Sequence, residues 1–178
     1  MEIENEQQLI EKAKANPAGF EPLYTAYYER ILRFVYKRME DLEDSRDVTA
    51  MVFSKALSNI GKYQYQGLPF SSWLYRIAIN EVNLFYRRTK KARIISLDER
   101  GLKGIVDEAD GLSNEDAAAL KKALMYLSEE ELLIIELRFF EERPFSQVAQ
   151  ILDITENNAK VKTYRILDKL RKVFTQIA

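Results

Sequence analysis

Residues 144–165 have the sequence PFSQVAQILDITENNAKVKTYR, which predicts two helices separated by a tight turn. In the first helix, apolar residues recur at three- and four-residue spacing and share one face: Phe145, Val148, Ala149 and Leu152. After a break at 153–155, the Thr155 hydroxyl can cap the second helix by accepting a hydrogen bond from a backbone N–H. The second helix then buries a stripe that consists of Ala159, Thr163, Ile166, Leu170 and Val173 or Phe174. This pattern predicts a helix-turn-helix, a motif whose second helix lies in the major groove of DNA.

The buried stripe determines which side chains of the second helix face outward, namely Asn157, Asn158, Lys160, Val161, Tyr164 and Arg165. Arginine forms bidentate pairs with guanine and asparagine with adenine, while valine or tyrosine can contact a thymine methyl group. Lys160 and Lys162 are expected to bind phosphates, which fixes the register on DNA but carries no sequence information. An ordinary helical hairpin with a polar face is the alternative, and the identity of these side chains favours DNA recognition over it.

Helical spacing of apolar residues continues through most of the chain, so the predicted fold class is all-α. Only 6 Gly and 4 Pro interrupt the 178 residues. The segment 94–116 differs, because it has few apolar residues and seven acids against two basic residues, a net charge of −5. We therefore predict two small helical domains, at 1–93 and 117–178, joined by a flexible acidic linker at 94–116, although a frayed helix would also fit this composition. The second domain contains the helix-turn-helix.

Charge is nearly balanced overall but segregated along the chain. Lys and Arg number 27 and Asp and Glu 28, yet residues 70–93 carry a net charge of +5 and residues 156–178 one of +4. A basic cluster in each domain indicates binding of a polyanion, and solvated helix surface is the alternative.

Composition excludes several classes of chemistry. The chain has no Cys and no His, so it has no disulfides, no Cys/His zinc site and no catalysis that depends on imidazole. Its N-terminal residues are acidic and lack the order of a signal peptide, and no apolar run approaches the roughly 20 residues that span a bilayer. We expect a cytoplasmic protein without direct membrane insertion.

Residues 70–88 have the sequence FSSWLYRIAINEVNLFYRR, which combines aromatic rings, two Asn residues and a basic end on one predicted helix. Tyr63 and Tyr65 come just before it. Aromatic rings stack on unpaired bases while nearby cations hold phosphates, which is the combination that single-stranded nucleic acid requires. Four residues are assigned to the core instead: Trp73, Leu74, Ile77 and Phe85. Tyr65, Asn80 and the basic side chains remain as candidates for DNA contacts.

Three segments resemble those of bacterial RNA polymerase sigma factors, in particular the small extracytoplasmic-function (ECF) group, which keeps only the second and fourth sigma domains. Residues 70–88 resemble the segment that melts the DNA, and residues 44–53, DSRDVTAMVF, resemble the helix that docks on the polymerase clamp. Residues 127–129, LSE, together with residues 145–162 resemble the fourth domain, in which Gly usually stands where this chain has Asp153. The likeness covers nearly the whole chain in the family's order.

This resemblance implies an alternative sigma factor, not an enzyme, that uses no cofactor and directs core RNA polymerase to promoters. Its partners would be the clamp and flap regions of the polymerase, promoter DNA in duplex and single-stranded form, and an anti-sigma factor. The minus-thirty-five element would be read as duplex by the outward-facing side chains of the second helix of the helix-turn-helix, namely Asn157, Asn158, Lys160, Val161, Tyr164 and Arg165, together with Lys162.

The first domain would open the minus-ten element and dock on the polymerase. Tyr65, Phe70 and Asn80 would hold an unpaired base of the non-template strand. Nearby phosphates would be held by Arg76, Arg87, Arg88, Lys90 and Lys91. The docking helix would use Asp44, Asp47 and Phe53, of which Phe53 is expected in the core.

Two other functions fit parts of the sequence. A stand-alone helix-turn-helix regulator that binds duplex DNA without polymerase would explain residues 117–178 but would leave the aromatic, basic first domain without a role. A helical Mg-dependent nucleotide hydrolase could take carboxylate ligands from Glu40, Asp41, Glu43 and Asp44, or from residues 129–131. Those acids cluster at predicted helix ends, where helix capping or solvated charge explains them better.

Overall fold

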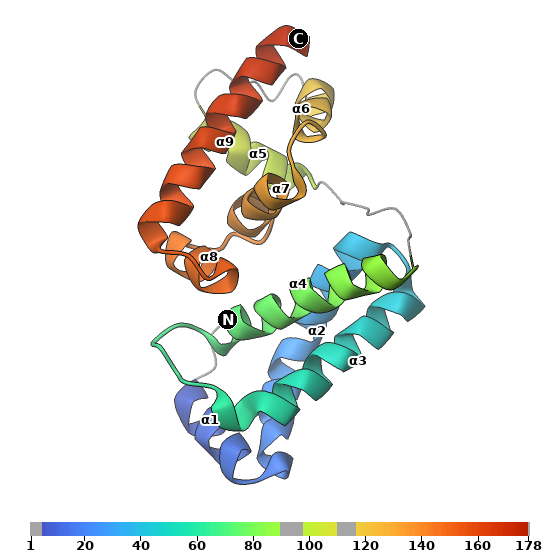
Figure 1. Cartoon of the computed structure of the whole chain (residues 1–178), viewed down its shortest axis with the longest axis vertical. Coiled ribbons are helices and arrows are strands. Elements are labelled where there is room, and N and C mark those ends of the chain that lie inside the picture. Colours follow the sequence, from blue (N-terminus) through green and yellow to red (C-terminus); the bar gives the residue numbers. More distant parts are fainter. Residues whose placement is uncertain (1–4, 90–97, 110–116, 178) are drawn as a thin grey trace. The chain divides into compact units, whose positions relative to one another are not determined.

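The computed structural model describes residues 5–89, 98–109 and 117–177, and every regular element within these ranges is helical (Figure 1). The predicted all-α class is therefore confirmed for the described chain. Two compact units are present, Met1–Ser96 and Leu97–Ala178. Among the described residues, none of the helices combines the length and the apolar character that a membrane span requires.

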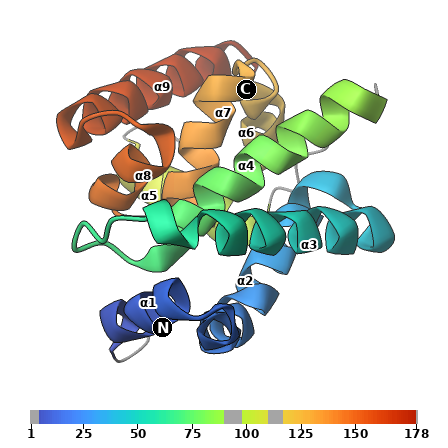
Figure 2. The same ribbon diagram turned by 60° about the horizontal axis from the view of Figure 1, so that its bottom comes forward.

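The first unit is built on three long helices that pack against one another: α2 (Glu21–Met39), α3 (Leu42–Asn59) and α4 (Phe70–Thr89). Figure 2 shows α3 and α4 lying side by side. Helix α1 (Glu6–Ala15) joins them through the 3-10 turns η1 (Pro17–Phe20) and η2 (Ile60–Lys62). The fully buried core side chains include Ile10, Leu23, Ile31, Phe34, Val35, Val52, Ala56, Leu74, Tyr75, Ala78 and Val82.

The connection between α2 and α3 shows how the sequence ends one helix and starts the next. Glu40 adopts a left-handed conformation, with φ of 53°, and its backbone N–H donates to the Tyr36 carbonyl. Asp41 then caps α3, because its carboxylate accepts a hydrogen bond of 2.8 Å from the Asp44 backbone N–H. The two helices consequently reverse direction over two residues.

The second unit consists of α5 (Glu99–Glu108), α6 (Ala117–Leu124), α7 (Glu129–Ile135), the π-helical turn η4 (Glu136–Phe140), α8 (Phe145–Leu152) and α9 (Glu156–Ile177). Helices α6, α7 and α8 all pack on the long α9. Ser128 and Glu131 form a reciprocal capping box that starts α7. The unit therefore has its own core, which includes Ile105, Leu120, Ala123, Ile135, Leu137, Val148, Ala159 and Leu170.

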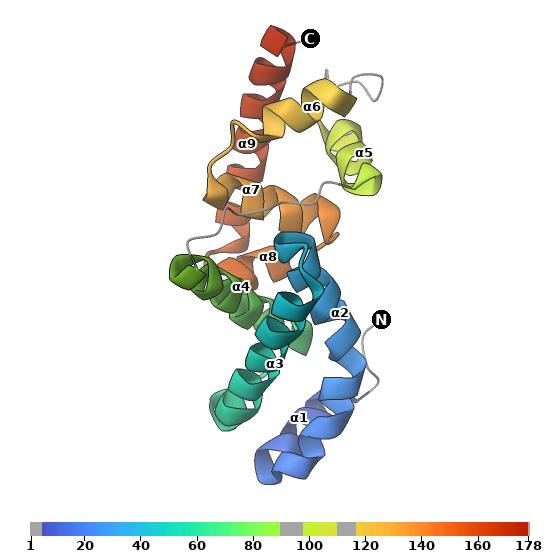
Figure 3. The ribbon, with the colours of Figure 1, turned by 90° about the vertical axis from the view of Figure 1, so that its right-hand side faces the viewer.

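The prediction of a flexible linker over residues 94–116 is wrong for its central part. Residues 99–108 form α5, which packs against η4 and is shown as a regular helix in Figure 3. Asp98 caps it by accepting a 2.8 Å hydrogen bond from the Gly101 N–H, and Leu102 and Ile105 are buried one turn apart. These two apolar residues share one face of the helix. Few apolar residues were therefore enough to dock α5, because η4 provides the surface against which they pack. The second unit therefore begins at Leu97 instead of residue 117.

Candidate nucleic-acid interface

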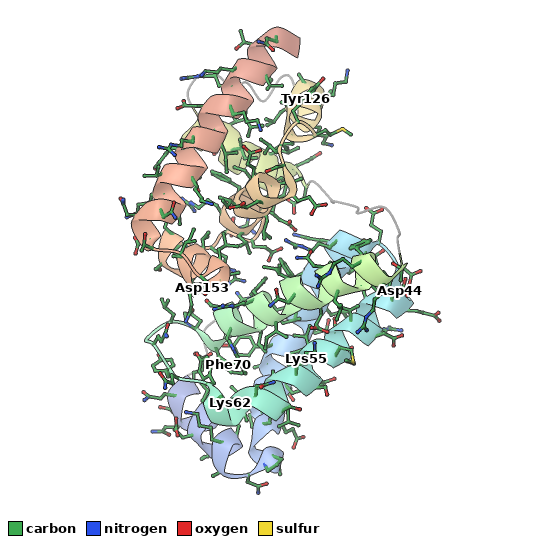
Figure 4. All side chains as sticks on the ribbon, viewed as in Figure 1. Asp44, Lys55, Lys62, Phe70, Tyr126 and Asp153 are labelled. Carbon is green, nitrogen blue, oxygen red and sulfur yellow. The ribbon has the colours of Figure 1, made fainter. Side chains whose placement is uncertain are left out.

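An open pocket of about 420 Å³ lies in the first unit where the end of α3, η2 and the first turns of α4 meet. We call it the α4 pocket. Two predicted DNA contacts, Arg76 and Asn80, both line it. Its remaining lining residues are Lys55, Asn59, Lys62, Tyr63, Trp73, Ile77 and Glu81. Figure 4 labels Lys55 and Lys62 on this side of the unit, with Phe70 at the start of α4.

One wall of the α4 pocket is aromatic. The rings of Tyr63 and Trp73 lie 4.8 Å apart between centroids, and both contact Phe70, at 5.2 and 5.3 Å. Phe70 is 0% exposed, so the structure places it in the core and not at the surface that its predicted base contact requires. Trp73 is only half-buried, which corrects its assignment to the core. The buried Phe70 ring supports the two rings that face the pocket.

Charge in the α4 pocket is biased toward the positive. Three cationic side chains, Lys55, Lys62 and Arg76, line it against the single carboxylate of Glu81. Lys55 is paired with the buried Glu81 at 2.6 Å, so a hydrogen-bonded ion pair forms part of the pocket lining. Cations beside aromatic rings and an amide are the groups that hold an unstacked nucleotide by its phosphate, its base face and its base edge.

Three lining residues of this pocket were not predicted from the sequence. Lys55 and Asn59 at the end of α3 and Lys62 in η2 follow a four- and three-residue spacing, and all three line the pocket beside α4. This spacing was the signal that could have identified them. Nothing in the sequence indicated that η2 would fold these residues against Trp73.

Tyr65 lies in a different place from Asn80. It lines a second pocket of about 340 Å³, which we call the loop pocket, with Asn5, Glu6, Gln7, Gln8, Gly67 and Pro69. The predicted trio of Tyr65, Phe70 and Asn80 is therefore divided among the loop pocket, the core and the α4 pocket. The loop that carries Tyr65 includes Gly67 at φ of 73°, a conformation that favours glycine.

The basic residues of α4 extend the positive surface along the helix. Arg76, Asn80 and Arg87 are separated by four and seven residues and share one exposed face. Arg88 is also exposed. The predicted phosphate contacts Lys90 and Lys91 lie outside the described residues.

The helix-turn-helix of the second unit has the predicted construction. Helix α8 packs on α9, and the Thr155 hydroxyl accepts a hydrogen bond of 3.2 Å from the Asn158 backbone N–H, which confirms the expected cap. Asp153 takes φ of 59°, in the left-handed region, which explains why glycine suits this position (Figure 4). The predicted buried stripe of α9 is confirmed for Ala159, Thr163, Ile166, Leu170 and Phe174.

Most of the predicted recognition residues face solvent from α9. Asn157, Asn158, Lys160, Val161, Tyr164 and Arg165 are all exposed. Lys162 differs, because it is half-buried and forms an ion pair with Glu130 of α7. Its predicted phosphate contact would require that pair to open, so Lys162 supports the junction of α7 and α9 in this structure. The Tyr164 hydroxyl donates to Glu108 at 3.3 Å, which connects the recognition face to the end of α5.

Helix α3 presents the residues predicted to dock on polymerase. Asp47 is exposed and Asp44 is half-buried. Phe53 is 3% exposed and packs edge-on against Tyr24 at 4.9 Å, so it lies in the core, as expected. The large apolar side chains that the same helix exposes are Leu42, Met51 and Leu57, which were not predicted to form a surface.

Two of the acids considered as magnesium ligands serve as helix caps. Asp41 caps α3, and Glu131 completes the capping box of α7. Within the described ranges, no three His, Cys, Asp or Glu side chains are grouped so that they could hold a metal ion. Capping therefore explains the positions of Asp41 and Glu131, and Glu130 is paired with Lys162.

Comparison with known proteins identifies the family. The family model for sigma-70 region 2 matches residues 23–92, and the model for sigma-70, region 4 matches residues 123–172. The chain therefore belongs to the sigma-70 family and carries its regions 2 and 4. Within that family it is of the ECF type, as are the following two curated relatives.

The ECF RNA polymerase sigma factor BldN of Streptomyces coelicolor is 28% identical over 173 residues, which cover 93% of this chain and 64% of BldN. The ECF RNA polymerase sigma factor SigW of Bacillus subtilis is 24% identical over 183 residues, which cover 97% of both chains. Among solved structures, CnrH in complex with the cytosolic domain of CnrY has the same fold, with a TM-score of 0.63 and 17% identity over 97% of this chain and 99% of that one.

Proposed function

We propose that this chain binds core RNA polymerase in the bacterial cytoplasm and directs it to promoters through two separate DNA contacts. Region 4 reads the minus-thirty-five element as duplex with the exposed face of α9. Region 2 opens the minus-ten element and holds an unpaired base of the non-template strand in the α4 pocket. An anti-sigma protein is a further partner that family membership leads us to propose.

The observation that carries the proposal is the composition of the α4 pocket. A half-buried Trp73 ring, the Asn80 amide and the Arg76 guanidinium line one open cavity. Stacking of an unpaired base on an aromatic ring contributes about 1–3 kcal/mol, which is similar to the cost of removing that base from the duplex. Such a pocket therefore stabilises an opened strand without an energy source.

Docking on the polymerase is assigned to the exposed side of α3. Asp47 and Met51 lie four residues apart and face solvent together. An exposed apolar side chain beside a carboxylate suits a partner surface that is apolar with a basic rim. Asp44 stands one turn earlier on the same helix.

The test is run-off transcription with core polymerase on a promoter library, with and without the chain. Selective initiation that depends on the chain is the expected result. A fluorescent base in the minus-ten element reports opening, and we expect Asn80→Ala to reduce this signal while duplex binding at the minus-thirty-five element is retained. Asn83→Ala, on the same helix but outside the pocket lining, is the matched control.

Two outcomes would contradict the proposal. Initiation that is no more selective with the chain than without it would exclude a sigma function. Tight, sequence-specific binding to duplex DNA by the chain alone, without association with core polymerase, would instead support a stand-alone regulator.

A further inference from the structure

Glu6 is a buried carboxylate at the start of α1, and both of its oxygens are engaged. It is 8% exposed. Oε1 accepts a hydrogen bond from the Tyr27 hydroxyl of α2, and Oε2 accepts one of 2.9 Å from the backbone N–H of Phe70. One side chain thus connects α1, α2 and the first residue of α4, which is 64 positions away in the sequence.

The Phe70 N–H is one of the donors that the first turn of a helix leaves without an intrahelical partner. Pro69, the preceding residue, has no side-chain acceptor with which to cap it. Glu6 supplies that acceptor from another helix, and its negative charge lies at the positive end of the α4 dipole. Helix α4 is therefore capped by a residue outside the region 2 match, which begins at residue 23.

The same carboxylate lies beside the aromatic wall of the α4 pocket. Burial, followed by the negative charge of Glu6 and the neighbouring Tyr65, raises the pKa of Tyr63 to about 12. Phe70, whose backbone Glu6 holds, packs its ring against Tyr63 and Trp73. Glu6 also lines the loop pocket with Tyr65. Glu6 therefore acts on both ends of the loop 63–69: its charge influences Tyr63 at one end, and it lines the loop pocket with Pro69 at the other.

We propose that Glu6 is a positioning residue for base capture: by tying α1 to the start of α4, it fixes the loop 63–69 and the Trp73 ring in the arrangement that accepts the unpaired minus-ten base. This inference rests on the proposed function of the α4 pocket. Glu6 does not contact the base in this scheme. Its effect passes through the Phe70 backbone to Trp73, three residues farther along the same helix.

Two substitutions separate the hydrogen bonds from simple packing. Glu6→Ala removes both acceptor oxygens, so the Phe70 N–H and the Tyr27 hydroxyl each lose this hydrogen bond. Loss of a hydrogen bond by a buried donor costs free energy of folding. Glu6→Gln keeps a carbonyl oxygen for the Phe70 N–H and offers an amide N–H to the Tyr27 oxygen. Glu11→Ala is the matched control on the same helix, since Glu11 is exposed and pairs with Lys14 at 2.8 Å.

The experiment uses the full chain with core polymerase and a promoter that carries 2-aminopurine in the minus-ten element. Opening is measured with each of the four bases at the captured position, below the unfolding temperature of every variant. We expect Glu6→Ala to lower the opening equilibrium about tenfold and to reduce the preference among the four bases. Glu6→Gln should restore both to within about twofold, and Glu11→Ala should match the wild type. Affinity for core polymerase and for minus-thirty-five duplex should be unchanged in all variants.

The results that overturn the inference are distinct from those that overturn the proposed function. A wild-type chain that opens no promoter refutes the proposed function before any variant is compared. A wild-type chain that opens the promoter, with Glu6→Ala retaining its opening and base preference, refutes the role of Glu6 alone. Equal losses in Glu6→Ala and Glu6→Gln would also refute it, because the tether depends on hydrogen bonds that Gln preserves. If Glu6→Ala does not fold, Tyr27→Phe removes one of the two bonds and should give a smaller loss of the same kind.

Discussion

Gly101 of α5 lies directly against the ring of Phe140 at the end of η4. A Cβ placed on Gly101 would stand 2.3 Å from Cδ1 of that ring, which is much closer than van der Waals contact allows. Helix α5 can therefore dock on η4 in this position only because residue 101 has no side chain. The docking also brings Glu108 within 3.1 Å of Arg138. Helix α5 therefore contacts η4 near both of its ends, through Gly101 and through Glu108.

Gly101→Ala should destabilise the second unit by about 1–3 kcal/mol, because the new methyl group must displace the Phe140 ring or the whole helix. Urea unfolding of the full chain measures this effect. Gly104→Ala is the matched control, since its Cβ would lie 3.5 Å from Phe139, an ordinary contact, and alanine favours a helix by about 1 kcal/mol over glycine. Equal effects of the two substitutions would show that α5 is not docked as described.

Arg165→Ala should weaken recognition of the preferred minus-thirty-five element by about 1–3 kcal/mol if the exposed guanidinium pairs with a guanine. The loss should be much smaller on a scrambled element, because only a base contact distinguishes the two. Competition binding with matched and scrambled duplexes measures the difference. Arg171→Ala, on the same helix and paired with Asp168 at 3.0 Å, is the control and should affect both duplexes equally.

Lys160→Ala should weaken binding to all duplexes alike and reduce the salt dependence of the affinity. A phosphate contact contributes about 0.9 to the slope of log affinity against log salt, so the slope should fall by about that amount. The exposed ion pair of Lys160 with Glu156 at 2.9 Å contributes little to folding, so stability should not change. Lys172→Ala, about 18 Å farther along α9, should leave the slope unchanged.

Glu131 makes the stability of the second unit depend on pH. Burial alone raises the pKa of this carboxyl, but hydrogen bonds from Lys169 and from Ser128 outweigh burial and hold the pKa below its usual value of 4.5. Because the folded-state pKa is lowered, the carboxylate stabilises the fold above about pH 4.5, and this contribution is lost as the pH falls through the folded-state pKa.

Glu131→Gln should therefore flatten the decline of the unfolding free energy between about pH 5 and pH 3. Glutamine can still complete the capping box, so the helix start is preserved. Urea unfolding across that range measures the slope, and Glu21→Gln, in the first turn of α2, is the control. A slope identical to that of the wild type would contradict the assigned role of Glu131.

The sequence predicted the elements whose formation depends on local spacing and local hydrogen bonds. The helices around Asp153, the Thr155 cap and the buried stripe of α9 all follow from residues within about one or two turns of one another. The exposed positions of Asn157, Asn158 and Arg165 follow in turn, because a buried stripe fixes the opposite face of a helix.

Tertiary structure alone decided which aromatic and charged side chains meet. The sequence could not distinguish Phe70, which is buried, from Trp73, which lines the α4 pocket, because both are aromatic residues of the same helix. Phe70 is buried because its ring packs against Phe20 and Tyr27, which come from distant parts of the chain. Residues 99–108 have too few apolar side chains to predict a docked helix, and α5 forms because η4 provides a surface that fits Gly101. Glu6 and Phe70 are 64 residues apart, and local rules do not extend across such a separation, so the cap that joins them exists only in the folded chain.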